Sequence, residues 1–215
     1  MDEGLLWLSN KDEIQKHLSS LNIFEKLAAS DGLIRIENFL PDVVATRSLE
    51  ILENISEWEI RQNNKTSNDA AKHQFYAAHP INEEDPLTLL MTLMQSIWPG
   101  KRSVFTAGKY NAGNHIDEHD DHAYVNDKRT GDTKKVLCSR DIAVIYYLTK
   151  DWNESDGGIL VDCLNKVRYL PKFNSLVIFE VPRFHKVTQC HRGPRYSLFG
   201  WFLEEGTYIV TNYHS

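Results

Sequence analysis

The chain has 215 residues, of which 41% are hydrophobic and 25% are charged. This composition is typical of a soluble globular protein, and no uninterrupted apolar run approaches the roughly 20 residues that a membrane-spanning helix needs. The formal net charge is -6, and the main basic stretch, DKRTGDTKK at 127–135, is interrupted by acidic residues. We therefore expect neither a nucleic-acid partner bound through a basic face nor a membrane partner.

The N-terminus and the cysteines indicate the compartment. The sequence begins MDEGLLWLSNKDE, without the basic segment, apolar core and cleavage site of a secretory signal. Cys138, Cys163 and Cys190 are odd in number and widely spaced, which argues against a disulfide framework and against a thiolate zinc site. A cytoplasmic protein with buried or half-buried thiols is the expectation.

The first hundred residues carry mainly helical patterns. Residues 10–30 are predicted to form a helix, because Asn10 and Glu13 make a capping box and apolar residues recur at helical spacing. Residues 31–40 alternate like a strand. The other expected elements are a helix over 42–55 with Pro41 at its first position, a polar loop over 61–73, and a helix over 87–97 introduced by Asp85 and Pro86.

From about residue 103 the pattern changes to short apolar or alternating runs, which predict β-strands. The runs are 103–110, 115–120, 142–148, 158–161, 166–170, 175–181, 185–190 and 195–203. Closely spaced strands that follow helices indicate a barrel or sandwich braced by those helices. We expect one domain over 1–215, mainly β, with a helical support region containing a few strands at 1–100 and a β core at 101–205.

A long polar connection runs from His122 to Arg140 and contains a glycine. Most connections in compact domains are shorter, so this one is either a lid or a disordered surface insertion. Arg140 could contact a substrate or simply lie at the surface.

The segment HIDEHDDH, from His115 to His122, concentrates groups that can bind a metal. In an extended strand alternate side chains share a face, so several of these groups would point the same way. A solvated strand edge would show the same pattern. The downstream run VPRFHKVTQCHRGPRYSLFGWF supplies a further histidine at a strand start and an arginine at the head of the next strand, which favours a site.

Two histidines and one carboxylate suit non-haem Fe(II), because they leave three coordination positions for substrates and oxygen. The sequence resembles the Fe(II)- and 2-oxoglutarate-dependent dioxygenases, especially the prolyl 4-hydroxylase-like branch, over roughly residues 104–203. The resemblance rests on five segments in the family's order: YNAGNHIDEHDD, IAVIYYLTKDWNESDGGIL, LPKFNSLVIFEV, FHKV and RYSLFGWF.

The resemblance implies a metal triad of His119, Asp121 and His185, which would also be the catalytic residues. His115 and Asp117 form a competing His-x-Asp pair, but they lie closer to the glycine of the preceding segment than the family's pattern has it. His122 would point to the opposite face of an extended strand. The remaining alternative ligand is His191, which lies in the turn-like CHRG.

The resemblance also implies a 2-oxoglutarate site. Arg195 would hold the distal carboxylate, since a guanidinium can bind a carboxylate through two parallel hydrogen bonds. Tyr147 and Tyr110 would add to this cofactor site, although either could instead pack as a core aromatic. Of the other residues nearby, we expect a turn position for Arg192, a close strand turn at GGIL (157–160), core positions for Trp152 and Trp201, and a surface position for Asp162.

The implied fold is a double-stranded β-helix, the jelly-roll or cupin-like form. The implied cofactors are Fe(II) and 2-oxoglutarate, with O2 as co-substrate and ascorbate as a candidate reductant. The implied reaction is hydroxylation of a proline in a peptide or protein. Alternatives are a small-molecule hydroxylase with the same iron site, a nucleic-acid demethylase, a zinc hydrolase and a non-catalytic β-barrel binding module. The sequence leaves the oligomeric state and the role of residues 1–100 open.

Overall fold

The computed structural model describes residues 2–64, 71–128 and 134–206. The helices in these residues are α1 (Glu3–Ser9), α2 (Lys11–Ser20), α3 (Ile23–Ala28), α4 (Asp42–Glu53), α5 (Pro86–Ser96) and the short 3-10 helix η1 (Glu154–Asp156). The strands are β1 (Leu33–Glu37), β2 (Glu59–Asn63), β3 (His73–Ala78), β4 (Arg102–Tyr110), β5 (His115–His119), β6 (Tyr124–Asp127), β7 (Val136–Tyr147), β8 (Leu160–Asp162), β9 (Val167–Tyr169), β10 (Ser175–Glu180), β11 (His185–Val187) and β12 (Arg195–Glu205).

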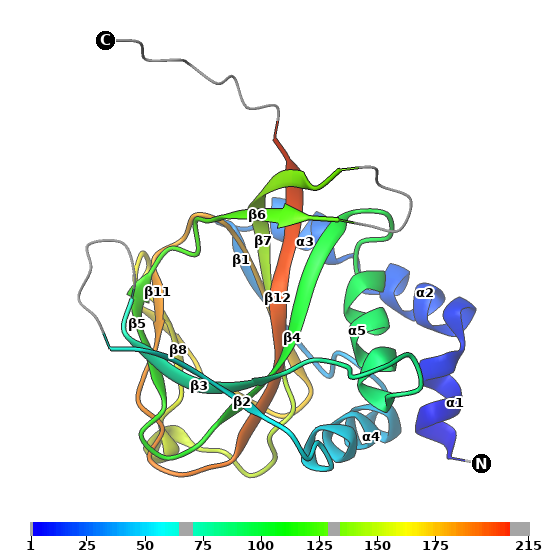
Figure 1. Cartoon of the computed structure of the whole chain (residues 1–215), viewed down its shortest axis with the longest axis horizontal. Coiled ribbons are helices and arrows are strands. Elements are labelled where there is room, and N and C mark those ends of the chain that lie inside the picture. Colours follow the sequence, from blue (N-terminus) through cyan, green and yellow to red (C-terminus); the bar gives the residue numbers. More distant parts are fainter. Residues whose placement is uncertain (1, 65–70, 129–133, 207–215) are drawn as a thin grey trace.

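The strands form one antiparallel sheet that curls on itself (Figure 1). Its order is β1-β10-β7-β12-β4-β3-β5-β11-β8-β9, with β2 added to β3 and β6 added to β7. Strands far apart in sequence are neighbours, as in β12, which lies between β4 and β7. This is the expected double-stranded β-helix, and the mainly β fold class is confirmed.

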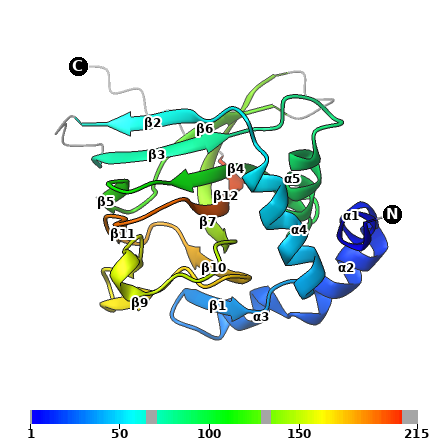
Figure 2. The same cartoon turned by 90° about the horizontal axis from the view of Figure 1, so that it is seen from below.

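The helices cover one flank of the sheet (Figure 2). Strand β10 is buried on both faces, because its alternate residues face two different cores. One core lies between the helices and the outer face of the sheet and includes Phe39, Met91, Tyr146 and Phe202. The other lies inside the curled sheet and includes Tyr110, Tyr147, Phe179 and Val187.

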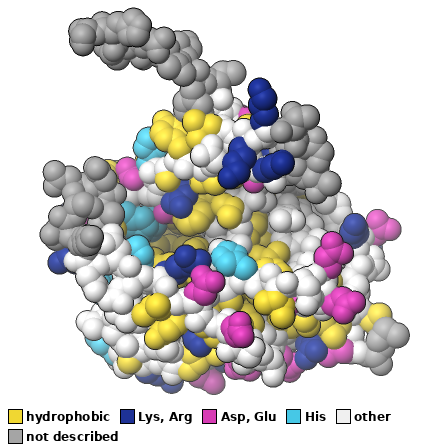
Figure 3. Space-filling model, viewed as in Figure 1, with side chains coloured by type: hydrophobic (Ala, Val, Ile, Leu, Met, Phe, Trp, Pro, Cys, Tyr) yellow, Lys and Arg dark blue, Asp and Glu magenta, His cyan; other side chains and the backbone are white. Residues whose placement is uncertain are grey.

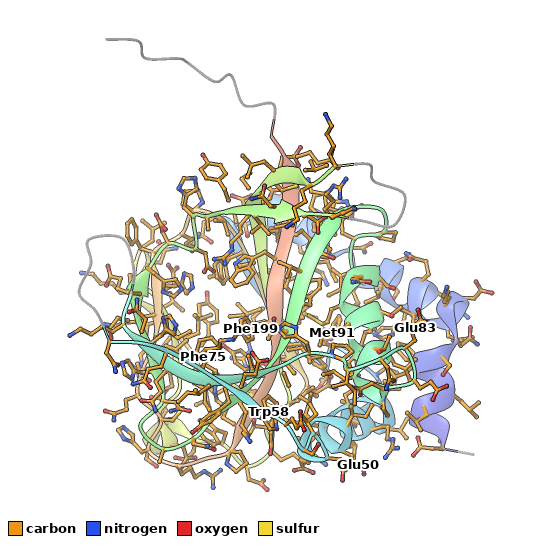
Figure 4. The ribbon with its side chains drawn as sticks, viewed as in Figure 1. Glu50, Trp58, Phe75, Glu83, Met91 and Phe199 are labelled. Carbon is orange, nitrogen blue, oxygen red and sulfur yellow. The ribbon has the colours of Figure 1, made fainter. Side chains whose placement is uncertain are left out.

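Figure 4 shows Met91 on α5, and Phe75 and Phe199 near the middle of the curled sheet. The rings of Phe75 and Phe199 meet edge to face, 5.7 Å apart. The outer core therefore holds the helices against the sheet, whereas side chains on the inner face of the sheet line a cavity.

The helix predicted over 10–30 is interrupted. It forms α2 and α3, because Asn22 between them adopts a left-handed conformation with φ of 50°. Asn10 caps α2 by accepting hydrogen bonds from the N–H groups of Asp12 and Glu13, but its own N–H donates to Trp7, so a reciprocal capping box does not form.

Further along, Pro41 is the N-cap of α4 rather than its first residue. Asp85 caps α5 and Pro86 takes the first helical position, as predicted. Among the described residues, no helix has the length and apolar character needed to cross a membrane.

Two predicted connections contain strands. The polar loop expected over 61–73 begins with the end of β2, and its residues 65–70 lie outside the described part. The connection from His122 to Arg140 contains β6 and the start of β7, which pair from Tyr124 with Ser139 to Asp127 with Val136; its residues 129–133 also lie outside the described part. Polar, exposed strands lack the apolar alternation by which strands are recognised, which explains both errors.

Candidate active site

The fold brings the two ends of the predicted triad together. His119 ends β5 and His185 begins β11, and the two residues are direct cross-strand partners. Asp121 follows β5 by two residues with φ of 62°, a left-handed conformation that turns its carboxylate back toward the histidines. One ligand atom from each of the three residues lies within 4.8 Å of the others. The three residues form a potential iron site.

Both histidine rings are held through Nδ1. His119 Nδ1 lies 2.8 Å from the carbonyl oxygen of Asp117, and His185 Nδ1 lies 2.7 Å from that of Arg183. A carbonyl only accepts, so each Nδ1 carries a proton, and in the neutral ring Nε2 is left with a lone pair that can bind a metal. The two Nε2 atoms lie 3.3 Å and 3.5 Å from the carboxylate oxygens of Asp121. The ligand atoms of the three residues thus converge on one point.

The environment also sets the charge of these groups. Burial raises the pKa of Asp121, but the hydrogen bond from His119 and the nearby histidines outweigh it, so the pKa of this carboxyl is lowered. Burial alone would lower the pKa of His119, yet its contact with Asp121 raises it. Burial lowers the pKa of His185. A carboxylate between two imidazoles is a donor set that suits Fe(II).

Asp121 is oriented by Trp201. The indole Nε1 of Trp201 donates to Asp121 Oδ2 over 3.0 Å, so this residue does more than pack in the core as predicted. Arg140 stacks on the same indole, with its guanidinium carbon 3.6 Å from the ring centre, and donates to the backbone oxygen of Asp121 over 3.3 Å. Trp201 is recognisable in sequence only as an aromatic of a strand, because its polar function depends on a neighbour 80 positions away.

Arg195, at the start of β12, is a large, fully charged side chain that is only 2% exposed. Its guanidinium carbon lies 4.0 Å from the ring centre of Tyr110 and 5.4 Å from that of Tyr147. Burial raises the pKa of both phenols, which keeps them neutral. Arg195 Nη1 donates to the carbonyl of Gly158 over 3.2 Å.

Two buried polar atoms here have no hydrogen-bond partner among the described residues: Arg195 Nε and the Tyr147 hydroxyl. Such atoms are costly unless a ligand satisfies them. A small dicarboxylate fits them, because its far carboxylate can accept from both donors. Close backbone approach makes room for this arrangement: Gly158 has φ of 62°, and a Cβ there would lie 2.6 Å from Cys190 Sγ and 3.2 Å from Arg195 Cδ.

A cavity of about 620 Å³ connects the metal triad with Arg195. The triad and Arg195 line it, together with apolar side chains that include Phe75, Ile116, Phe179 and Phe199. In Figure 3 the hollow on this face contains hydrophobic side chains and has Lys, Arg and His side chains around it. A pocket that joins a metal-type triad to a buried cation can hold a chelating acid between them.

The competing residues lie apart from the triad. His115 Nε2 faces Asp117 at 3.9 Å, and its ring is held by the carbonyl of Gly113. His122 lies at the cavity wall with its ring against Tyr124. The other two alternatives, His191 and Arg192, are exposed. Arg192 forms an ion pair with Asp156 at 3.1 Å, and its guanidinium lies over the ring of Trp152.

The surface position predicted for Asp162 was wrong. Asp162 is 0% exposed, and its carboxylate forms an ion pair with Arg183 at 2.7 Å. Arg183 itself was not recognised from the sequence as part of the site, although it stands only two residues before His185. The only sequence signal was an arginine two residues before a predicted metal ligand, in the segment VPRFHKV.

A double-stranded β-helix with two histidines and one carboxylate at its mouth is the arrangement of non-haem iron oxygenases. Residues 105–203, which contain most of the β core, match the family model of the 2OG-Fe(II) oxygenase superfamily. The family confirms the expectation of a dioxygenase that uses 2-oxoglutarate, Fe(II) and O2.

Solved structures share the fold. A prolyl-4-hydroxylase from Pseudomonas putida is 22% identical, covering 88% of this chain and 100% of its own, with a TM-score of 0.59. A prolyl hydroxylase from Trichoplax adhaerens, in complex with a peptide fragment of the hypoxia inducible factor oxygen degradation domain, is 21% identical; 88% of this chain and 91% of that chain are covered, with a TM-score of 0.63.

A viral collagen prolyl hydroxylase from Paramecium Bursaria Chlorella virus-1, in its 2-oxoglutarate complex, is 15% identical. It covers 81% of this chain and 97% of its own, with a TM-score of 0.53. At these identities the likeness establishes the fold.

Proposed function

We propose that this protein hydroxylates a proline residue within a peptide or protein. His119, Asp121 and His185 hold Fe(II), and Arg195 binds the far carboxylate of 2-oxoglutarate with help from the Tyr147 hydroxyl. Tyr110 supports the guanidinium by stacking. The observation that carries this proposal is the pair of unpartnered donors, Arg195 Nε and the Tyr147 hydroxyl, buried on the wall of the cavity that the triad opens into.

Bound Fe(II) and 2-oxoglutarate would supply the oxidative chemistry, in which 2-oxoglutarate and O2 yield succinate, carbon dioxide and a hydroxyl group on the substrate carbon. The protein's contribution is orientation. Trp201 keeps one oxygen of Asp121 engaged, so that the other faces the metal position. The backbone carbonyls at Asp117 and Arg183 hold the two imidazoles with Nε2 inward.

Aromatic rings pack against the triad and the Arg195 site. Phe179 packs edge to face on His185 with ring centres 4.7 Å apart, and Phe75 stacks on Tyr110 at 5.4 Å. An apolar surround strengthens the ion pair between Arg195 and a bound carboxylate, because little water competes with it.

The peptide substrate is supported by two features. The fold is shared with prolyl hydroxylases, one of them bound to a peptide fragment. The cavity is also lined by polar residues of separate segments, Arg61 and His73 from β2 and β3, and His122, which follows β5, with Arg140 on β7. An opening between two polar walls suits an extended chain with a pyrrolidine ring directed inward.

The support region and the location belong to the same proposal. We infer that residues 1–100 brace the β core within one domain, because α4 and α5 share the outer core with β7 and β12. We also propose a cytoplasmic location, which the three free cysteines suit.

The test is turnover with Fe(II), 2-oxoglutarate and ascorbate on a library of proline-containing peptides, read by mass spectrometry for an added oxygen and by succinate release. Free proline and other amino acids form the second arm. Hydroxylated peptide in amounts equal to succinate is expected, and replacing the proline by alanine should abolish it. Oxidation of free amino acids alone would contradict the peptide proposal and establish the small-molecule alternative.

A further inference from the structure

A buried arginine, Arg183, contacts the metal ligand His185 without being a ligand itself. We propose that Arg183, clamped by Asp162 and Asp31, is a positioning residue that fixes His185 in its metal-binding orientation. The inference rests on the iron site of the proposed function. It also assigns a task to the N-terminal half of the chain, since Asp31 lies in the turn between α3 and β1.

The backbone of Arg183 contacts both ligand-bearing segments. Its carbonyl oxygen accepts from His185 Nδ1 at 2.7 Å, which sets the tautomer and the plane of that ring. Its N–H donates to the carbonyl of Asp120 over 3.2 Å, directly before Asp121. A shift of this one residue would therefore move His185 relative to the carboxylate ligand.

The side chain of Arg183 donates to four oxygens, two from Asp162 on β8 and two from Asp31 in the turn before β1. Nη2 and Nε donate to the two carboxylate oxygens of Asp162 over 2.7 Å and 3.2 Å, a forked contact. Nη1 donates to the backbone oxygen of Asp31 over 2.7 Å, and Nη2 also reaches its carboxylate at 3.2 Å. Asp162 is in turn the cross-strand partner of His185. Arg183 is thus tied to β8 through Asp162 and to the turn before β1 through Asp31.

Stability alone does not explain this arrangement. Arg183 is 6% exposed and Asp162 is 0% exposed, so both charges give up hydration, and an apolar pair could stabilise the fold as well or better. What a forked ion pair adds is a defined geometry, because a planar guanidinium binds a carboxylate in few orientations. The segment that gains this definition, residues 181–184, has no regular secondary structure of its own.

The test uses the metal-free protein with three variants. Arg183→Lys keeps the charge pair but loses the fork. Arg183→Gln combined with Asp162→Asn removes both charges together, so no buried charge is left unpaired. The control is Arg168→Gln. Arg168 lies on β9, next to β8, and the substitution breaks its exposed ion pair with Glu154. Each is titrated anaerobically with Fe(II), and then with 2-oxoglutarate at saturating Fe(II).

We expect both Arg183 variants to bind Fe(II) about tenfold more weakly, the size of effect typical for partners that orient metal-ligating histidines. Affinity for 2-oxoglutarate at saturating metal should stay at the wild-type value, because the Arg195 site is untouched. The control should match wild type in both titrations.

Wild-type Fe(II) affinity in either folded Arg183 variant overturns the inference. So does a parallel loss of Fe(II) and 2-oxoglutarate affinity that follows the melting temperature, since it would indicate a structural role only. Failure of the wild-type protein itself to bind Fe(II) contradicts the proposed function as a whole, which separates the two failures. If the double variant does not fold, the charge-conserving lysine variant gives the result.

Discussion

Replacing Tyr147 by phenylalanine should change stability and cofactor binding in opposite directions. The phenol is 1% exposed, and its hydroxyl has no hydrogen-bond partner among the described residues. Without 2-oxoglutarate, that hydroxyl has no acceptor among the described residues, and only the guanidinium of Arg195 lies beside it. With 2-oxoglutarate bound as proposed, it donates to the carboxylate that Arg195 holds.

The magnitudes follow from the two states. An unsatisfied buried hydroxyl costs about 1–3 kcal/mol, so Tyr147→Phe should raise the unfolding free energy of the ligand-free protein by about 1 kcal/mol. A hydrogen bond to a charged group contributes about 1.5–3 kcal/mol, so the affinity for 2-oxoglutarate should fall about tenfold or more. Urea unfolding measures the first quantity, and anaerobic titration of the Fe(II)-loaded protein measures the second.

The adjacent tyrosine gives a matched control. Tyr146 points into the outer core, where its hydroxyl donates to Asn174 Oδ1 over 3.0 Å. Tyr146→Phe should lower the unfolding free energy by about 1 kcal/mol and leave 2-oxoglutarate binding unchanged. Unaltered 2-oxoglutarate affinity in Tyr147→Phe, or equal destabilisation by both substitutions, would refute the reasoning.

Two further predictions concern the metal site and the core. Trp201→Phe removes the donor to Asp121 and should weaken Fe(II) binding about tenfold, as measured by anaerobic titration; wild-type affinity would show that this hydrogen bond has no positioning role. Phe39→Ala empties a fully buried position against Tyr146 and should cost about 3–5 kcal/mol in urea unfolding, with Fe(II) affinity of the folded protein retained. Loss of metal affinity at full folding would contradict the separation of the two cores.

Strands were predictable where they are buried, because burial leaves a clear run of apolar residues in the sequence. The runs at 142–148 and 175–181 are continuous apolar segments, and they became the central strands β7 and β10, each buried on both faces. Three strands were missed: β2 and β6 are mostly exposed or half-buried, and β3 is half-buried over most of its length. Their strand structure comes from pairing with a neighbour, which local sequence does not record.

The candidate triad and Arg195 were predicted from the order of short segments, and the structure places His119, His185 and Arg195 at strand ends, with Asp121 two residues after β5. The supporting residues could not be predicted in this way. Asp162 reads as an ordinary acid after a short strand, and its burial is explained only by Arg183, 21 positions later. Trp201 likewise acquires its polar function from Asp121, in a distant segment. Such pairs depend on three-dimensional proximity, which spacing along the chain does not reveal.

The central claim is that one cavity holds Fe(II) through the triad and 2-oxoglutarate through Arg195. Anaerobic absorption spectroscopy tests it most directly, with metal-free protein titrated with Fe(II) and then with 2-oxoglutarate. A visible charge-transfer band should appear only with both ligands, vanish in His119→Ala and require far more 2-oxoglutarate in Arg195→Ala. Absence of the band in well-folded wild-type protein, or its persistence in His119→Ala, would contradict the assignment.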